Sequence, residues 1–343
     1  MNLKGLATGV GSLPFKDPVP ALDLIFNYLP QAPFWPQLPK MNAQEGMLAQ
    51  FSQNLPGLQF NAGAVHFSAL NIEQELERFY EKFIAQDLAY FQITSAFAQG
   101  LYLFFERLKK EDLSRIEFIK CQVTGPFTFC AGITTADNKS ILHDEILFQA
   151  MVKGLTMKAL WQLDLFRQFG KKIILFFDEP YLTGIGSAYT AIERSKVVEV
   201  YSELTAHLKT ENCLVGIHCC GNTDWSMLTD IPGIDLINFD AFNFQERFLL
   251  YAQNLKVFLE RGGVICWGVV PTQEYNSTIT AQSLNVKLMA GLELLIKKGL
   301  SRKLLLENMM LSPACGLGTL DAQKAEAILS LLHQTSLLVR KNL

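Results

Sequence analysis

The residues best suited to chemistry lie in the run His218-Cys219-Cys220-Gly221-Asn222, directly after a short apolar stretch. Side chains along an extended strand alternate between its two sides, so His218 and Cys220 share one side while Cys219 points away. Neutral imidazole and thiolate are both ligands of zinc, which is usually tetrahedral and keeps one exchangeable position at catalytic sites. The spacing therefore predicts that His218 and Cys220 hold one zinc ion, with further ligands from elsewhere in the chain.

Cys315 is the best candidate for a third ligand. It stands in the run Ser-Pro-Ala-Cys-Gly-Leu-Gly, where the glycines allow the backbone to turn tightly. Asp240 ends another apolar run, and its carboxylate could fill a fourth position. The alternative is a buried histidine beside a small apolar thiol, but a second thiol and an acid after other strands favour the metal site. The other cysteines in or beside apolar runs are predicted to fill the core: Cys121, Cys130, Cys213 and Cys266.

Short apolar runs alternate with amphipathic stretches, a pattern typical of a parallel sheet with helical crossovers. The predicted strands are Leu6–Val10, Phe34–Leu38, Ile116–Val123, Ile173–Phe177, Leu214–Ile217, Leu236–Phe239, Val264–Gly268 and Met309–Leu311. The predicted helices are Asn71–Ala96, His143–Phe169, Ala191–Thr210, Phe244–Arg261, Ala281–Gly299 and Asp321–Leu338. Eight strands indicate an α/β fold, a single (β/α)₈ TIM barrel over residues 1–343, in which Met41–Ser68 has no assigned element.

The polar and glycine-containing motifs each follow a predicted strand closely. They are Gly11-Ser12, Thr124-Gly125-Pro126, Asp178-Glu179-Pro180, His218 to Asn222, Asp240 and Cys315-Gly316. In a barrel of this type, all of them fall on the C-terminal face, where such barrels carry their active sites. Loop residues without a shared function would instead be distributed over both ends of the barrel, so this convergence favours a functional site.

Composition narrows the function classes. The net charge is -3, 49% of residues are hydrophobic, and lysine and arginine are scattered rather than clustered, which argues against a nucleic-acid partner. The N-terminal segment has no signal-peptide pattern and no apolar run approaches the roughly 20 residues that span a bilayer, so we expect a cytoplasmic protein without membrane contact. Seven cysteines without a secretory signal make a disulfide framework improbable.

These motifs, in this order, resemble the catalytic, C-terminal barrel of the cobalamin-independent methionine synthase family. That family belongs to a superfamily with uroporphyrinogen decarboxylase and the coenzyme M methyltransferases. The resemblance implies zinc bound by His218, Cys220, Asp240 and Cys315, with aspartate where the family commonly has glutamate. It also implies homocysteine as the substrate, with Gly11 and Ser12 at its carboxylate and Asp178, the predicted catalytic residue, at its ammonium group. Without the resemblance, Ser12 would be interpreted as a turn residue and Asp178 as a helix N-cap.

The chain departs from the folate-using enzymes of that family at three positions. Gly132 replaces a tryptophan, Gly184 a glutamate, and Gln273 a proton-donating histidine. We therefore predict that the methyl donor is a methylcorrinoid presented by a separate protein, rather than methyltetrahydrofolate. Three alternatives remain open: another acceptor thiol such as coenzyme M, decarboxylation of a porphyrin-like substrate, which requires arginines at the barrel mouth, and a non-catalytic metal-binding barrel.

Overall fold

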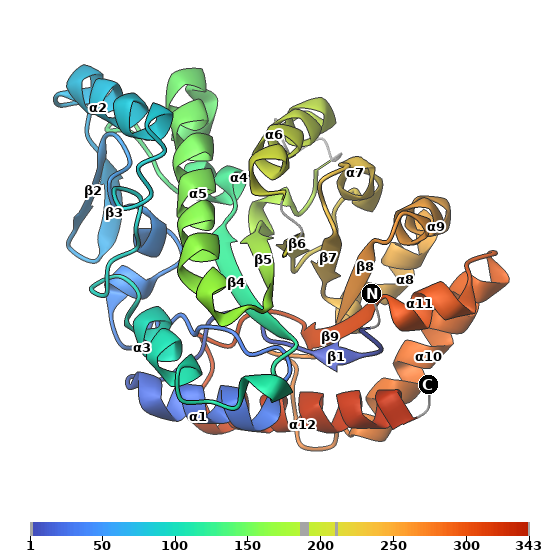
Figure 1. The fold of residues 1–343 in the computed structure, drawn as a ribbon. Helices are drawn as coiled ribbons and strands as arrows, with labels where there is room; N and C mark the ends of the chain where they lie inside the picture. Colours follow the sequence, from blue (N-terminus) through green and yellow to red (C-terminus); the bar gives the residue numbers. More distant parts are fainter. Residues whose placement is uncertain (1–2, 186–191, 210–211, 342–343) are drawn as a thin grey trace.

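The computed structural model of the chain describes residues 3–185, 192–209 and 212–341. Its main element is a curled sheet of seven parallel strands in the order β1-β9-β8-β7-β6-β5-β4, consistent with a TIM-barrel-like fold (Figure 1). The strands are β1 (Leu6–Ala7), β4 (Phe118–Thr124), β5 (Lys172–Asp178), β6 (Cys213–Cys219), β7 (Leu236–Phe239), β8 (Val264–Val270) and β9 (Met309–Pro313). Each corresponds to one of the predicted strands.

The predicted strand Phe34–Leu38 is the exception, because it forms isolated bridges instead of a regular ladder. Phe34 bridges to Lys120 of β4, and Gln37 bridges to Ser12, which follows β1. The segment thus makes parallel contacts to both edge strands of the sheet. Pro33, Pro36 and Pro39 explain the broken ladder, since proline has no N–H to donate.

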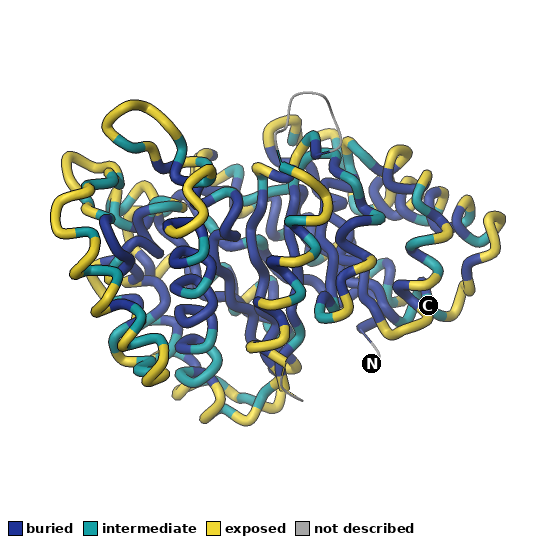
Figure 2. Tube along the Cα trace, turned by 90° about the horizontal axis from the view of Figure 1, so that it is seen from above, coloured by how far each residue is buried: buried dark blue, intermediate teal, exposed yellow. Residues whose placement is uncertain are grey.

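Two apolar cores lie on opposite sides of the strands, because side chains alternate between the two faces of each strand. A small core inside the curl contains residues such as Phe118, Ile174, Phe176, Leu236 and Met310. A larger core lies between the strands and the surrounding helices, and it contains the residues next to these in sequence. The strands of the seven-stranded sheet are accordingly buried along most of their length, while most exposed residues lie on the outer helices and loops (Figure 2).

Helices surround the sheet (Figure 1). They are α1 (Pro18–Tyr28), α2 (Ile72–Ile84), α3 (Gln99–Leu108), α4 (Pro126–Ala131), α5 (Glu145–Phe166), α6 (Arg194–Leu208), α7 (Trp225–Asp230), α8 (Ala241–Phe248), α9 (Ala252–Glu260), α10 (Ala281–Lys297), α11 (Arg302–Glu307) and α12 (Ala322–Lys341). The predicted helix Asn71–Ala96 ends early at Ile84, and the one predicted over Phe244–Arg261 is two helices, α8 and α9. The predicted ends Ala191 and Thr210 lie outside the described residues.

The stretch without an assigned element, Met41–Ser68, contains two short 3-10 turns, Ala43–Glu45 and Ala49–Phe51, and an antiparallel hairpin. The hairpin strands β2 (Leu58–Asn61) and β3 (Ala64–Phe67) lie beside α2 (Figure 1). Glu45, at the end of the first 3-10 turn, and Met47, between the two turns, line the cavity described below.

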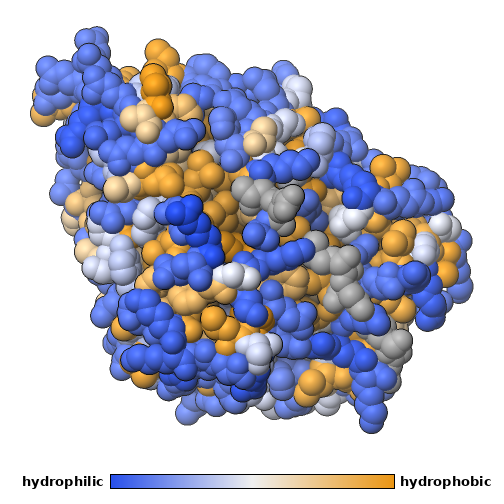
Figure 3. Space-filling model, viewed as in Figure 1, coloured by the Kyte–Doolittle hydropathy of each residue, from blue (hydrophilic) through white to orange (hydrophobic). Residues whose placement is uncertain are grey.

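Figure 3 shows a face that is largely hydrophilic, with apolar side chains between the polar ones. Within the described ranges, no helix is both long and apolar enough to cross a membrane.

Candidate metal centre and substrate pocket

His218, Cys220 and Cys315 come together at the carboxyl ends of the strands. Their potential ligand atoms all lie within 4.8 Å of one another. His218 belongs to the end of β6, and Cys315 follows β9, so the two contributions come from distant parts of the chain. Cys219 points the other way, as the alternation predicts, and its sulfur lies 3.5 Å from Thr183 Oγ1. This group could hold a metal ion such as zinc.

The tautomer of His218 is set by its neighbours. Asn238 donates through Nδ2 to the carbonyl oxygen of Cys266 and to Ser312 Oγ, both at 2.8 Å. Its Oδ1 therefore faces His218 Nδ1 at 2.5 Å and must accept the proton there. This leaves a lone pair on His218 Nε2, which is buried and has no hydrogen-bond partner among the described residues. A nitrogen oriented in this way is suited to bind a metal ion.

The two thiols of the group perturb each other. Contact with Cys315 lowers the pKa of Cys220, and the same contact raises the pKa of Cys315. Burial acts to lower the pKa of His218, but the contact with Cys315 and the charge of Asp178 outweigh it and raise that pKa. A bound metal cation would displace the protons of the two thiols and would require an unprotonated Nε2 on His218, because metal binding requires thiolates and a neutral imidazole.

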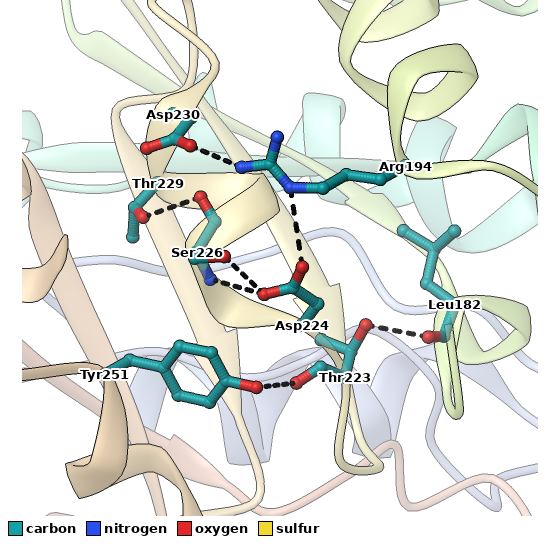
Figure 4. Close-up of polar contacts among 8 residues, drawn as sticks. All are labelled: Leu182, Arg194, Thr223, Asp224, Ser226, Thr229, Asp230 and Tyr251. Carbon is teal, nitrogen blue, oxygen red and sulfur yellow. Dashed lines mark hydrogen bonds and ion pairs between the residues drawn. The ribbon is translucent and has the colours of Figure 1, made fainter. Parts of the chain in front are cut away.

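A polar network fixes the loop that carries Cys220 (Figure 4). Thr223 donates through Oγ1 to the carbonyl oxygen of Leu182 at 2.8 Å, which ties the loop after β6 to the one after β5. Asp224 caps α7 and lies 3.5 Å from Arg194 Nε, while the same guanidinium bonds Asp230. The position of Cys220 therefore depends on neighbouring elements as well as on its own strand.

Beside the three ligands lies a cavity of about 430 Å³. Its lining residues are Val10, Ser12, Gln37, Pro39, Glu45, Met47, Asp178, Pro180, His218, Cys220, Thr272, Gln273, Cys315, Gly316, Gly318 and Thr319. Two of these are acidic, and none of these described lining residues is a lysine or arginine. The cavity is therefore better suited to a ligand with a cationic group than to one with several carboxylates.

Asp178 is the acidic residue next to the ligand group. It is paired in register with His218 across β5 and β6, which places both side chains on the inner side of the sheet. Its side chain is buried and Oδ1 has no described hydrogen-bond partner. Burial raises the pKa of Asp178, and the charges of Lys120 and His218 oppose that rise. A buried carboxylate oxygen without a partner is costly, so a cationic ligand would relieve it.

Ser12 brings a hydroxyl group to the cavity, whereas Asp178 brings a carboxylate. Its Oγ accepts a hydrogen bond from the Gly318 N–H at 3.2 Å, which leaves the hydroxyl hydrogen free to donate. Gly316 permits this approach, because a Cβ there would lie 2.3 Å from Ser12 Oγ. Gly11 is not part of the cavity lining, and its carbonyl oxygen accepts from the Gln37 N–H at 3.1 Å.

Asp240 is not brought into the three-residue group. It is the N-cap of α8, where Oδ1 accepts from the backbone N–H of Asn243 and Oδ2 from its side-chain amide, both at 2.8 Å. Both carboxylate oxygens are thus engaged at the helix start. The structure thus gives Asp240 a capping role at the start of α8 and leaves it outside the group of His218, Cys220 and Cys315. Its role as a fourth metal ligand stays a prediction.

Sequence reasoning did not identify the role of Glu179, the middle residue of Asp-Glu-Pro. Its fully buried carboxylate accepts four hydrogen bonds, from the N–H groups of Phe127 and Thr128, from Thr128 Oγ1 and from Tyr201 OH. It fits beneath Gly125, where a Cβ would lie 2.2 Å from its carboxyl carbon. The Thr-Gly-Pro and Asp-Glu-Pro motifs therefore form one joint between β5 and α4, held together by the carboxylate of Glu179.

A role for Lys120 was not predicted from the sequence either. The signal was a charged residue inside a predominantly apolar strand. Alternation along β4 points it into the curl, where it is buried beneath Asp178 and bonds the carbonyl oxygen of Val10 and Gln122 Oε1. Burial lowers the pKa of Lys120 to about 8. Its charge lies close enough to favour the ionised form of Asp178.

Neither a family model nor a curated protein matches the sequence. The fold is similar to a solved structure described as a B12-independent methionine synthase from Shewanella sp. W3-18-1 in complex with selenomethionine, with a TM-score of 0.59 and 16% sequence identity. The match covers 100% of this chain and 99% of that chain. The chain therefore has a fold similar to that methionine synthase barrel, and it carries a His-Cys-Cys group that could bind zinc.

Proposed function

We propose that this protein is a zinc-dependent S-methyltransferase that methylates homocysteine, with a methylcorrinoid held by a separate protein as the donor. The observation that carries the proposal is the convergence of His218 Nε2, Cys220 and Cys315 beside a partnerless carboxylate oxygen of Asp178. A solved structure of similar fold, described as a methionine synthase in complex with selenomethionine, supports an amino acid as the ligand.

His218, Cys220 and Cys315 would hold the zinc ion. Bound there, zinc would supply the Lewis acidity that keeps a substrate thiol deprotonated at neutral pH, where a free thiol of pKa about 8.5 is mostly protonated. Asn238 keeps the imidazole proton on Nδ1, so Nε2 remains available as a ligand. The loop network around Thr223 and Asp224 holds Cys220 in place.

The ends of homocysteine match the polar groups of the cavity. Ser12 would donate its free hydroxyl hydrogen to the substrate carboxylate. Asp178 would accept the ammonium group, with Lys120 beneath it favouring the charged carboxylate. Two such contacts fix the orientation of the thiol and reduce the entropy cost of reaching the reactive geometry.

The proposal of a methylcorrinoid donor rests on the groups that stand in place of the folate-enzyme residues. Gln273, which the sequence resemblance aligns with the proton-donating histidine, lines the cavity, and its Nε2 donates to Thr319 Oγ1 at 3.2 Å. A methyl group on cobalt passes to a thiolate without protonation of the leaving group, unlike the methyl group of a folate amine. A site with an amide in the position of that histidine is compatible with the first reaction.

The two enzyme alternatives fit the cavity less well. A porphyrin-like substrate carries several carboxylates, and the described cavity lining offers no lysine or arginine to bind them. Coenzyme M has a sulfonate and no ammonium group, so it would leave Asp178 Oδ1 without a partner. Both observations favour an amino acid thiol.

The proposal is tested by following methionine formation from homocysteine with the zinc-loaded protein. One reaction contains methylcobalamin, a second contains methyltetrahydrofolate, and a third replaces homocysteine with coenzyme M. We expect methionine in the first reaction only. Activity with the folate alone would reject the corrinoid donor, and methylation of coenzyme M without homocysteine activity would reject the acceptor.

A further inference from the structure

Gln37 has a side-chain orientation that is determined by a chain of hydrogen bonds. The carbonyl oxygen of Phe97 can only accept, and it accepts from Gln50 Nε2 at 2.8 Å. Gln50 therefore presents its Oε1 to Gln37 Nε2, at 2.7 Å. This relay of hydrogen bonds therefore ends at Gln37 Oε1, which is an acceptor. Its direction is set, through Gln50, by the carbonyl oxygen of Phe97.

The backbone around Gln37 is held equally firmly. Its N–H donates to the carbonyl oxygen of Gly11, and its own carbonyl oxygen accepts from Leu13 at 2.9 Å. The following residue, Leu38, donates its N–H to Glu45 Oε2 at 2.9 Å. The segment therefore cannot shift along the sheet without breaking several hydrogen bonds.

The residue Gln37 lies at the substrate cavity. Gln37 lines the cavity together with Ser12 and Asp178, and its Oε1 lies 2.7 Å from the position of a Cβ on Gly11. Within the described ranges, no group donates a hydrogen bond to this oxygen. The cavity thus offers a second oriented acceptor in addition to Asp178.

We propose that Gln37 is a specificity-determining residue that accepts a hydrogen bond from the ammonium group of the substrate, so that the site selects α-amino acid thiols. This inference rests on the proposed function. An ammonium group has three hydrogens to donate, and Asp178 has one partnerless oxygen to receive them. A neutral amide supplies another acceptor without adding charge, so one carboxylate still balances one ammonium group.

The test compares the binding of homocysteine and of 4-mercaptobutanoate, which lacks the amino group, by titration calorimetry of the zinc-loaded protein. The wild type is expected to prefer homocysteine. In Gln37→Met the affinity for homocysteine should fall by about 10- to 100-fold, as expected for a hydrogen bond to a charged group. The affinity for 4-mercaptobutanoate should stay within about twofold, since it makes no such hydrogen bond.

Gln162→Met is the matched control. Gln162 is another buried glutamine. Its side chain is hydrogen-bonded to Trp35 Nε1 and to the carbonyl oxygen of Gln122, but it does not line the cavity. Its variant should retain the wild-type preference between the two thiols. Gln50→Met provides a second test that leaves the cavity lining unchanged. Without Gln50 Oε1 as its acceptor, the Gln37 amide can flip and exchange its oxygen and nitrogen. Gln50→Met should therefore also reduce the preference for homocysteine over 4-mercaptobutanoate.

The possible failures are distinguishable. Equal losses for both thiols in Gln37→Met, or no loss for either, would overturn the role of Gln37 while leaving the proposed function intact. A wild type that binds neither thiol would overturn the proposed function, and the role of Gln37 with it.

Discussion

At the scale of single residues, three cysteines close together in the fold have different surroundings. Cys219 and Cys220 are adjacent in sequence, yet Cys219 is buried towards Thr183 while Cys220 faces Cys315 and His218. The cause is the alternation of side chains at the end of β6. Residue type alone does not distinguish these thiols, and the direction of the side chain does.

This difference gives a matched prediction. Cys315→Ser should no longer bind zinc stoichiometrically, because the substitution removes a direct ligand. The loss of zinc affinity should exceed the roughly 10- to 100-fold loss that follows when a residue that only supports a ligand is removed. Cys219→Ser should keep zinc at the wild-type ratio. Metal content after dialysis measures both, and circular dichroism checks that each variant is folded. Equal zinc content in the two variants would contradict the proposed metal site.

At the scale of elements, the joint between β5 and α4 depends on one buried acid. Glu179 receives the first N–H groups of α4 and the Tyr201 hydroxyl, so it connects α4 and α6 to the end of β5. Burial raises the pKa of Glu179 to about 7, against the lowering effect of its hydrogen bonds to Thr128 and Tyr201. A folded-state pKa above the unfolded value means that the folded protein binds the proton more tightly.

The pH dependence of stability follows with a definite sign. The contribution from Glu179 should be fully present below pH 4.5, its ordinary pKa, and decline as pH rises through about 7. Glu179→Gln removes this titration and turns an amide N–H₂ towards donors, so it should lower the free energy of unfolding by about 1–3 kcal/mol. Urea denaturation at several pH values measures both effects. An advantage of wild type over variant that grows between pH 5 and 7 would contradict this assignment.

The sequence predicted the seven sheet strands because each is a short apolar run with β-branched or aromatic residues. It failed at Phe34–Leu38, where prolines interrupt the ladder, and at Asn71–Ala96, where only the first half forms a helix. The gathering of His218, Cys220 and Cys315 was predictable, since parallel strands bring their carboxyl ends to one face. The capping role of Asp240 depends on the local turn into α8, which strand patterns do not encode.

At the scale of the whole molecule, the site joins segments that are far apart in sequence. Cys220 and Cys315 follow β6 and β9, while the loop after β9 also bonds Ser12 near the N-terminus through Leu317 and Gly318. The amide relay of Gln37, Gln50 and Phe97 adds further segments, since these residues are 13 and 47 positions apart in sequence. Such orientations arise only after the chain has folded, so no local pattern in the sequence predicts them.

Because the ligands come from distant segments, zinc should bind the folded chain far more tightly than the unfolded chain. Linkage then predicts stabilisation by about 4 kcal/mol when free zinc is 1,000 times its dissociation constant. Removal of zinc by a chelator should therefore lower the melting temperature by several degrees, and added zinc should restore it. Cys315→Ser should melt at the same temperature with and without chelator, whereas Cys219→Ser should respond as the wild type does. A melting temperature that is insensitive to chelator in a wild type shown to contain zinc would mean that the metal does not bridge these segments.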